Sequence, residues 1–137
     1  MILLDTGPIV ALFDPRDDAH AQVRAMLKGI KEPLLTTLPV LTEAFHLLDP
    51  ASRGSTALRE FVMHGGARVF ELGEAALIRA FQLMEQYRDH PMDLADASLV
   101  VAGEVTRTTK VFTLDRKDFA TYRARIGRSA RGFRLVT

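Results

Sequence analysis

The most constraining feature of the sequence is the stretch from Pro91 to Phe119, where two acids precede a long apolar segment. Asp93 and Asp96 open this segment, and the apolar side chains that follow recur at helical spacing, which predicts a helix buried on most of its surface. The positions that carry this spacing are Leu94, Ala97, Val101 and Val105. Residues 110–114 then predict a short buried strand that ends at Asp115.

Short apolar runs alternate with helical patterns along the rest of the chain. Strands are predicted at 2–4, 34–37, 69–72 and 133–136, and helices at 9–13, in 15–30, at 39–48, around 58–62 and at 74–87. Residues 120–132 form a basic connection for which the pattern predicts no definite structure. This alternation is typical of an α/β fold with a mainly parallel sheet covered on both faces. The 137 residues fit one domain, residues 1–137, with a single core.

Composition limits the chemistry and the location of the protein. Apolar residues make up 47% and charged residues 26% of the chain, which is typical of a soluble globular protein. There is no cysteine, so any metal must be held by oxygen or imidazole ligands. The N-terminus has no basic stretch typical of a secretory signal, and no apolar run is long enough to span a membrane. We therefore expect a cytoplasmic protein without membrane contact.

The charge is uneven although its net value is only +1. From position 116 onward there are seven basic residues and one acid, Asp118. This excess can be a solvated basic surface, or it can be a footprint for a phosphate backbone that is independent of sequence and weakened by salt. The candidate RNA-binding residues are Arg116, Lys117, Arg123 and Arg125.

Acidic residues follow two of the predicted strands. Asp5 and Asp115 each come directly after a strand, and the carboxyl ends of parallel strands share one edge of a sheet. Asp96 reaches this edge if its helix begins there, and Glu43 lies on the helix after the second strand. Asp5 can also be only a helix N-cap, and Glu43 only a solvated helix residue. Converging carboxylates repel one another unless a cation neutralises them, and oxygen ligands suit Mg²⁺ or Mn²⁺.

Other chemistries lack their residues. The sequence has no G-x-S-x-G elbow, no Walker A motif, no G-x-G-x-x-G motif and no H-E-x-x-H motif, and its four histidines are scattered. A haloacid-dehalogenase-like phosphatase also has an Asp after its first strand, but it needs a second acid at the position of Gly7. That alternative is weakened and stays open. A divalent cation can generate hydroxide and stabilise charge on a phosphoryl oxygen, as phosphodiester hydrolysis requires.

Four segments together resemble the PIN-domain ribonucleases, particularly the VapC-type toxins of toxin–antitoxin pairs. These are LLDTGPIVALFD, TTLPVLTEAFHLL, MDLADASLVVAGE and VFTLDRKDF, in the order and spacing of that family, and they extend from residue 2 to about 119. The resemblance implies a three-layer α/β/α sandwich with an acidic pocket for Mg²⁺ or Mn²⁺. The catalytic and metal-binding acids that it implies are Asp5, Glu43, Asp96 and Asp115, and the supporting residues are Asp93, Thr6 and Thr113.

The resemblance also implies function and partners. It suggests a metal-dependent endoribonuclease that cleaves an RNA substrate, forms a homodimer and is inhibited by a cognate antitoxin protein. One alternative is a catalytically idle PIN-like module that binds RNA or a protein, and another is a housekeeping RNA-processing nuclease. A titratable Mn²⁺ site distinguishes the nucleases from the idle module. In this resemblance Asp118 is interpreted as a structural capping residue.

Overall fold

The protein is built on a five-stranded parallel sheet with the strand order β3-β2-β1-β4-β7. A computed structural model describes residues 1–136. The strands are β1 (Ile2–Leu4), β2 (Leu34–Thr37), β3 (Arg68–Phe70), β4 (Lys110–Phe112) and β7 (Arg134–Leu135). The prediction for 34–37 is confirmed, whereas the strands predicted at 69–72, 110–114 and 133–136 are shorter or shifted by one or two residues.

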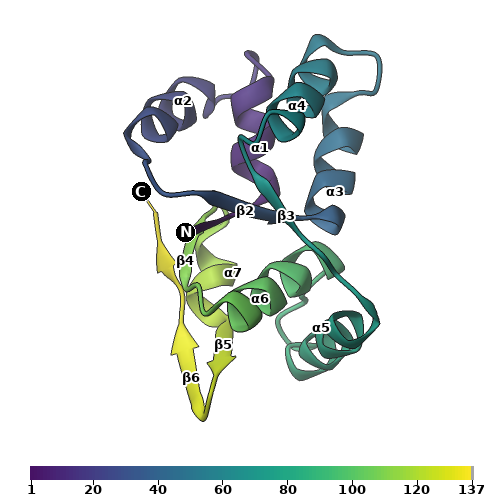
Figure 1. Cartoon of the computed structure of the whole chain (residues 1–137), viewed down its shortest axis with the longest axis vertical. Helices are drawn as coiled ribbons and strands as arrows, with labels where there is room; N and C mark the ends of the chain where they lie inside the picture. The colour runs from purple at the N-terminus through teal and green to yellow at the C-terminus, as the bar shows by residue number, and fades with distance from the viewer. Residues whose placement is uncertain (137) are drawn as a thin grey trace.

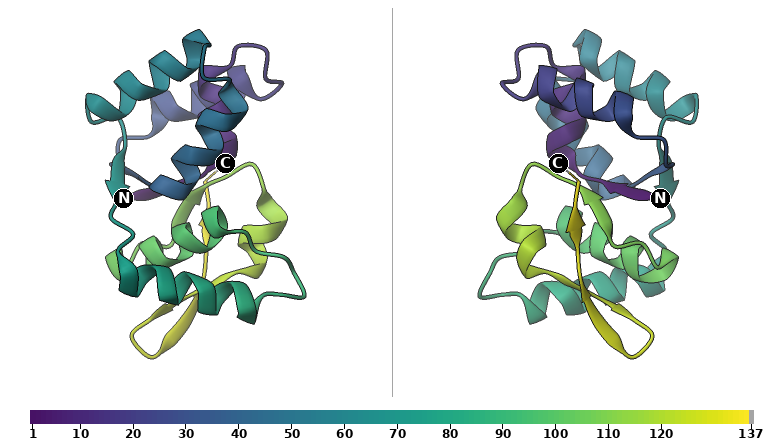
Figure 2. Two further views of the ribbon diagram at one scale, coloured as in Figure 1. Left: turned by 90° about the vertical axis from the view of Figure 1, so that its right-hand side faces the viewer. Right: turned by 90° about the vertical axis from the view of Figure 1, so that its left-hand side faces the viewer.

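Helices cover both faces of this sheet (Figures 1 and 2). One layer holds α1 (Thr6–Phe13), α2 (His20–Gly29), α3 (Leu38–Leu48) and α4 (Arg53–Met63), and the other holds α5 (Glu74–Gln86), α6 (Leu94–Thr106) and α7 (Arg116–Thr121). The prediction of an α/β/α sandwich with a mainly parallel sheet is therefore confirmed. The short connections bring a helix N-terminus to the carboxyl end of β1, β2 and β4.

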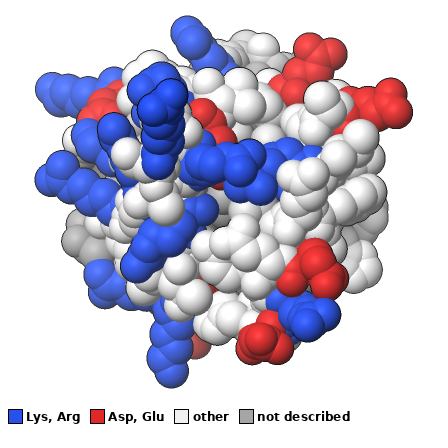
Figure 3. Space-filling model, turned by 90° about the horizontal axis from the view of Figure 1, so that it is seen from below, with Lys and Arg blue, Asp and Glu red and all other residues white. Residues whose placement is uncertain are grey.

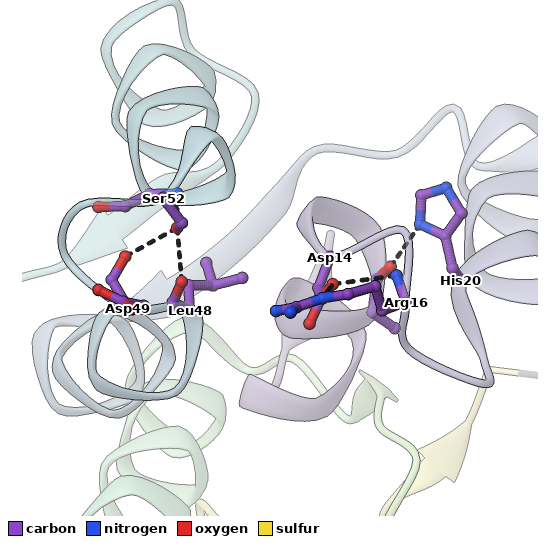
Figure 4. Close-up of polar contacts among 8 residues, drawn as sticks. Asp14, Arg16, His20, Leu48, Asp49 and Ser52 are labelled. Carbon is purple, nitrogen blue, oxygen red and sulfur yellow. Dashed lines mark hydrogen bonds and ion pairs between the residues drawn. The ribbon is translucent and has the colours of Figure 1, made fainter.

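Local polar contacts fix where the helices begin. The Thr37 hydroxyl accepts a hydrogen bond from the Val40 amide at 3.4 Å, and Pro39 lies in the first turn of α3. Ser52 caps α4 in the same way, and its hydroxyl also donates to the carbonyl of Leu48 at the end of α3 (Figure 4). Figure 4 also shows the connection between α1 and α2, where a ring nitrogen of His20 lies 2.7 Å from the Ala11 carbonyl.

α6 is the central helix of the core, as its sequence predicts. Eight of its residues are buried, in an almost unbroken run from Ala95 to Gly103. A Cβ on Gly103 would lie 2.6 Å from the Thr108 carbonyl oxygen, so glycine is required for this close packing. The expectation for Val105 is wrong: 64% of it is exposed, because the last turn of α6 turns this side chain away from the core that buries Ala97 and Val101.

Most of residues 120–132, for which the sequence predicts no definite structure, form an antiparallel hairpin. It consists of β5 (Arg123–Ile126) and β6 (Ser129–Gly132), joined at Gly127, which has a φ of 62°. Ala124 and Ile126 are buried, while all four residues of β6 are exposed. The hairpin projects from the lower end of the molecule in Figure 1. Within residues 1–136, no helix has the length and apolar character needed to span a membrane.

Candidate active site

A cavity of about 700 Å³ opens at the carboxyl edge of β1 and β4. Half of the residues that line it are acids, and neither Lys, Arg nor His contributes to it. The acids that line it are Asp5, Asp17, Glu43, Asp93, Asp96, Asp115 and Asp118. The cavity therefore brings together all four acids that the sequence predicts, together with Asp93, and adds Asp17 and Asp118.

Asp5 is the most buried of these acids, with 7% of its surface exposed. Its carboxylate caps α1 by accepting a hydrogen bond from the Thr6 amide at 2.8 Å. The pKa of Asp5 is raised to about 6, chiefly by burial and to a smaller extent by the charges of Glu43 and Asp93, while the hydrogen bonds from Thr113 and Thr6 lower it. The interpretation of Asp5 as a helix N-cap is thus correct, but the same side chain also lines the cavity.

Thr113 connects the ends of two strands. Its hydroxyl donates to Oδ2 of Asp5 at 2.7 Å and accepts a hydrogen bond from the backbone amide of Asp115 at 2.9 Å. One buried hydroxyl therefore orients Asp5 and fixes the backbone at Asp115. The neighbouring hydroxyl of Thr6 is buried and has no hydrogen-bond partner among residues 1–136.

Asp93 and Asp96 stand at the start of α6, as the sequence predicts. Asp93 is the N-cap, and its carboxylate accepts a hydrogen bond from the Asp96 amide at 2.8 Å. The buried Tyr122 donates its hydroxyl to Oδ2 of Asp96 at 3.3 Å. Burial, followed by the charges of Asp93 and Asp5, raises the pKa of Asp96 to about 8. Tyr122 was not predicted, because nothing local links it to an acid 26 positions earlier.

Asp115 and Asp118 form the part of the cavity nearest α7. Asp115 caps this helix by accepting a hydrogen bond from the Asp118 amide at 3.5 Å. A hydrogen bond with the Asp118 side chain raises the pKa of Asp115. The sequence predicts that Asp118 caps the turn, but its carboxylate instead lies 2.6 Å from Nε2 of His90. The sequence gives no indication of this contact.

A second, larger hollow adjoins this cavity. It is an apolar groove of about 1040 Å³ between α3, the segment that follows β3 and the start of α6. Glu43 and Asp93 line both the groove and the cavity, so the two are continuous. The polar side chains of the groove include Glu71 and His46 but no Lys or Arg. Glu43 is half-buried, which is more than a purely solvated helix residue requires.

Comparison with known proteins identifies the family. The model of the PIN domain family matches residues 2–124. The chain belongs to the PIN-domain family. A curated relative, ribonuclease VapC26 from Mycobacterium tuberculosis, is 30% identical over 128 residues, which cover 89% of this chain and 92% of the relative.

Solved structures show the same PIN fold. Mycobacterium tuberculosis VapC20, described as a toxin that cleaves the sarcin–ricin loop, aligns with a TM-score of 0.77 at 16% identity and covers 95% of this chain and 99% of its own. A toxin–antitoxin complex from Klebsiella pneumoniae aligns with a TM-score of 0.65 at 19% identity and covers 88% of this chain and 92% of its own. VapBC2 from Rickettsia felis, bound to a promoter DNA fragment, aligns with a TM-score of 0.61 at 12% identity and covers 98% of each chain.

The donor set of this PIN domain fits a divalent cation. Hard carboxylate oxygens without a competing basic side chain are the ligands of Mg²⁺ and Mn²⁺, and the unpartnered Thr6 hydroxyl adds an oxygen beside Asp5. Among residues 1–136, no three His, Asp or Glu side chains already stand close enough to enclose one ion. Rotation of side chains such as Asp96 and Asp115, which are only partly buried or exposed, is therefore needed for three of them to meet at one ion.

The four predicted RNA-binding residues of the PIN domain differ in their surroundings. Arg116 and Lys117 are exposed in the first turn of α7, beside the cavity acid Asp115. Arg125 is exposed on β5. Arg123 is engaged within the fold, because its Nη1 lies 2.9 to 3.3 Å from the carbonyl oxygens at the C-terminal end of α7 and donates to them.

Proposed function

We propose that the protein is a metal-dependent endoribonuclease and the toxin of a toxin–antitoxin pair. The observation that carries this proposal is the acidic cavity, in which burial and mutual repulsion raise the pKa values of Asp5 and Asp96. Carboxylates in such a place favour a cation as their counter-charge. The similarity to ribonuclease VapC26 supports RNA as the substrate and supports residues 1–137 as a single PIN domain.

Asp5, Glu43, Asp96 and Asp115 would hold the cation, with Asp93 at the edge of the set. Mg²⁺ or Mn²⁺ supplies Lewis-acid stabilisation of a phosphoryl oxygen and activates water for attack on the phosphodiester. The set consists of carboxyl groups alone, so it favours a cation before it accepts a polyanionic substrate.

The remaining residues hold this set in position. Thr113 orients the Asp5 carboxylate, and Tyr122, directly after α7, donates to the Asp96 carboxylate at the start of α6. Such supporting contacts typically change metal affinity or activity by about 10- to 100-fold when they are removed. Arg116 and Lys117 lie at the rim, where a positive charge draws RNA towards an otherwise repulsive cavity.

The decisive experiment is cleavage of total tRNA and ribosomal RNA by the purified protein with Mg²⁺, with Mn²⁺ and with EDTA. The variant Asp96→Asn removes one carboxylate from the cavity, and Asp18→Asn, at an exposed acid outside it, is the matched control. We expect discrete fragments that require metal, persist in Asp18→Asn and disappear in Asp96→Asn.

Other outcomes would contradict the proposal in different ways. Fragments that form in EDTA, or equally with Asp96→Asn, would indicate a contaminating nuclease. Absence of both cleavage and a titratable Mn²⁺ site would favour the catalytically idle binding module. Cleavage of a defined precursor RNA at one processing site would favour a housekeeping nuclease.

We propose the apolar groove as the site for the antitoxin. Its walls include Leu38, Val69 and Leu94, and its rim is acidic, so it fits an apolar segment that carries a basic side chain. Its continuity with the cavity would let that basic side chain neutralise the carboxylates and displace the cation. The similarity in fold to toxin–antitoxin complexes supports an antitoxin partner.

We also propose a cytoplasmic homodimer. Ile78 and Phe81 on α5 are 52% and 53% exposed, although large apolar side chains favour burial. A second copy packed on this helix would cover them. Light scattering after size exclusion tests the dimer, and Phe81→Ser is expected to shift it towards the monomer. A monomeric wild-type protein would contradict this part of the proposal.

A further inference from the structure

We propose that the β5–β6 hairpin binds the RNA phosphate backbone and sets substrate affinity without selecting sequence. This inference rests on the proposed ribonuclease function and adds a binding surface to it. The hairpin lies beyond the acidic cavity, at the lower end of the molecule, and Figure 3 views this end directly. Lys and Arg side chains gather on one side of this end.

The hairpin carries positive charge that nothing nearby neutralises. No acid occurs between Asp118 and position 137, while five arginines do. The side chains of Arg125, Arg128 and Arg131 are exposed and make no hydrogen bond or ion pair within the described part of the chain. Arg131 lies opposite the buried Ala124 in the register of the two strands, so it is on the same face of the hairpin as Ala124. Arg125 is on the opposite face, and Arg128 lies at the turn.

Among residues 1–136, the one acid that contacts the hairpin backbone is already paired. Glu104 on α6 accepts two hydrogen bonds from the Arg79 guanidinium, at 2.9 and 3.0 Å, and its Oε2 also accepts the Arg125 amide at 2.6 Å. This contact anchors β5 to α6 while its negative charge is balanced by Arg79. The guanidiniums of Arg125, Arg128 and Arg131 are therefore available to an external anion.

The composition of the hairpin surface indicates which anion it fits. Apart from arginine, its exposed residues are Gly127, Ser129, Ala130 and Gly132. Protein interfaces depend on aromatic or apolar anchors, and membrane surfaces on inserted apolar side chains, and this surface presents neither. It also has no exposed aromatic ring on which a base could stack. Arginine contacts to phosphate oxygens need none of these features.

The hairpin is placed to act on the same RNA as the cavity. Tyr122, whose hydroxyl contacts Asp96, directly precedes β5. At a rise of about 3.3 Å per residue, the turn at Gly127 lies at most about 17 Å from Tyr122 along the strand. Arg116 and Lys117 directly follow the cavity acid Asp115, in the first turn of α7, and β5 begins two positions after α7 ends. An RNA strand leaving the cavity can therefore meet positive charge first at α7 and then along the hairpin.

The test measures binding of a labelled 20-nucleotide poly(U) RNA to the full-length protein in EDTA, at a series of KCl concentrations. The hairpin variant combines Arg125→Gln, Arg128→Gln and Arg131→Gln. The control combines Arg24→Gln, Lys28→Gln and Arg59→Gln, which removes the same charge from exposed positions in the α2–α4 layer, on the other face of the sheet. A single-stranded DNA of equal length tests whether binding follows the phosphates.

We expect the hairpin variant to raise Kd roughly 10- to 100-fold at low salt and to reduce the slope of log Kd against log salt by about 2. The control should change Kd less than about threefold, and the DNA should bind within a few-fold of the RNA. In cleavage assays with metal, the hairpin variant should raise KM with little change in kcat.

Equal Kd for the hairpin variant and the control would overturn the inference, even if the protein cleaves RNA normally. If the hairpin variant loses binding to phosphatidylserine vesicles but binds RNA as the wild type does, the inference is also overturned, and the hairpin is assigned to a lipid surface. If the wild-type protein binds RNA through the hairpin but never cleaves it, the inference stands and the proposed nuclease activity fails.

Discussion

Thr113 shows how one small side chain controls a charged site. Its hydroxyl donates to the Asp5 carboxylate and accepts the Asp115 amide, so it links residues that are 110 positions apart. The hydrogen bond to Asp5 favours the ionised carboxylate, which opposes the effect of burial on the pKa of Asp5.

We predict that Thr113→Val lowers cation affinity and cleavage by about 10- to 100-fold, because Asp5 then loses its hydroxyl donor and retains a proton to higher pH. Thr113→Ser keeps the hydroxyl and should retain most of the activity. Isothermal titration with Mn²⁺ at pH 7 and cleavage assays measure both effects. Equal losses in the Val and Ser variants would show that the hydroxyl alone does not account for the effect.

At the scale of elements, the sequence predicts best where packing is continuous. α6 is recognisable because its run of small and apolar residues is buried on nearly every side, and β2 because all four of its residues are buried. The hairpin escapes prediction because its alternation rests on Ala124 and Ile126 alone, among arginines.

The candidate site follows the same division. Its acids were predictable because Asp5 and Asp115 directly follow strands and Asp93 and Asp96 begin a helix. Tyr122 and His90 were not, because their partners lie 26 and 28 positions away and become neighbours only through the packing of α6 and α7.

The tight packing around Gly103 of α6 gives a prediction for stability. In Gly103→Ala the new methyl group would lie 2.6 Å from the Thr108 carbonyl oxygen and 3.2 Å from Leu3 Cδ1, so α6 or the segment at Thr108 must shift. We expect a loss of about 1–3 kcal/mol in the free energy of unfolding.

Gly29 on α2 provides the matched control, because a Cβ there meets nothing within 4 Å. Gly29→Ala should be neutral or should stabilise the protein by up to about 1 kcal/mol. Urea denaturation followed by circular dichroism compares the two variants. A Gly103→Ala variant as stable as the wild type would show that α6 and the segment at Thr108 can separate without a measurable cost.

At the scale of the whole molecule, the raised carboxyl pKa values make stability depend on pH. The folded protein keeps a proton on Asp5 up to about pH 6 and on Asp96 up to about pH 8, whereas both carboxyls ionise near pH 4 when the chain unfolds. The folded state therefore binds more protons in this range, and its stability falls as pH rises through 6 and 8.

We predict that, in EDTA, the free energy of unfolding decreases by roughly 1–3 kcal/mol between pH 4.5 and 9, after allowance for solvent screening at the partly exposed Asp96. Asp96→Asn should flatten the part of this decline between pH 6 and 9, while Asp18→Asn should not. Denaturation at several pH values tests this expectation. An unchanged slope in Asp96→Asn would assign the pH dependence to other groups.

A divalent cation should reverse this decline, because it takes the place of the protons between the carboxylates. At 100 times its Kd, a cation that binds only the folded state adds about 2.7 kcal/mol to the free energy of unfolding. We predict that Mn²⁺ raises Tm more at pH 8 than at pH 5, as measured by differential scanning fluorimetry. An equal rise in Asp96→Asn would place the bound ion outside the cavity.

The span of the Asp5–Thr113 contact has a consequence for synthesis of the protein in a cell. β1 lies between β2 and β4, and the carboxylate at its end is oriented by a residue 108 positions later. A chain still on the ribosome lacks β4 and its acids until the segment after α6 has been made, so it cannot present the assembled cavity before then. On the proposed ribonuclease function, products truncated before β4 should be harmless to RNA, and an inhibitor would be needed only after β4 has joined the sheet.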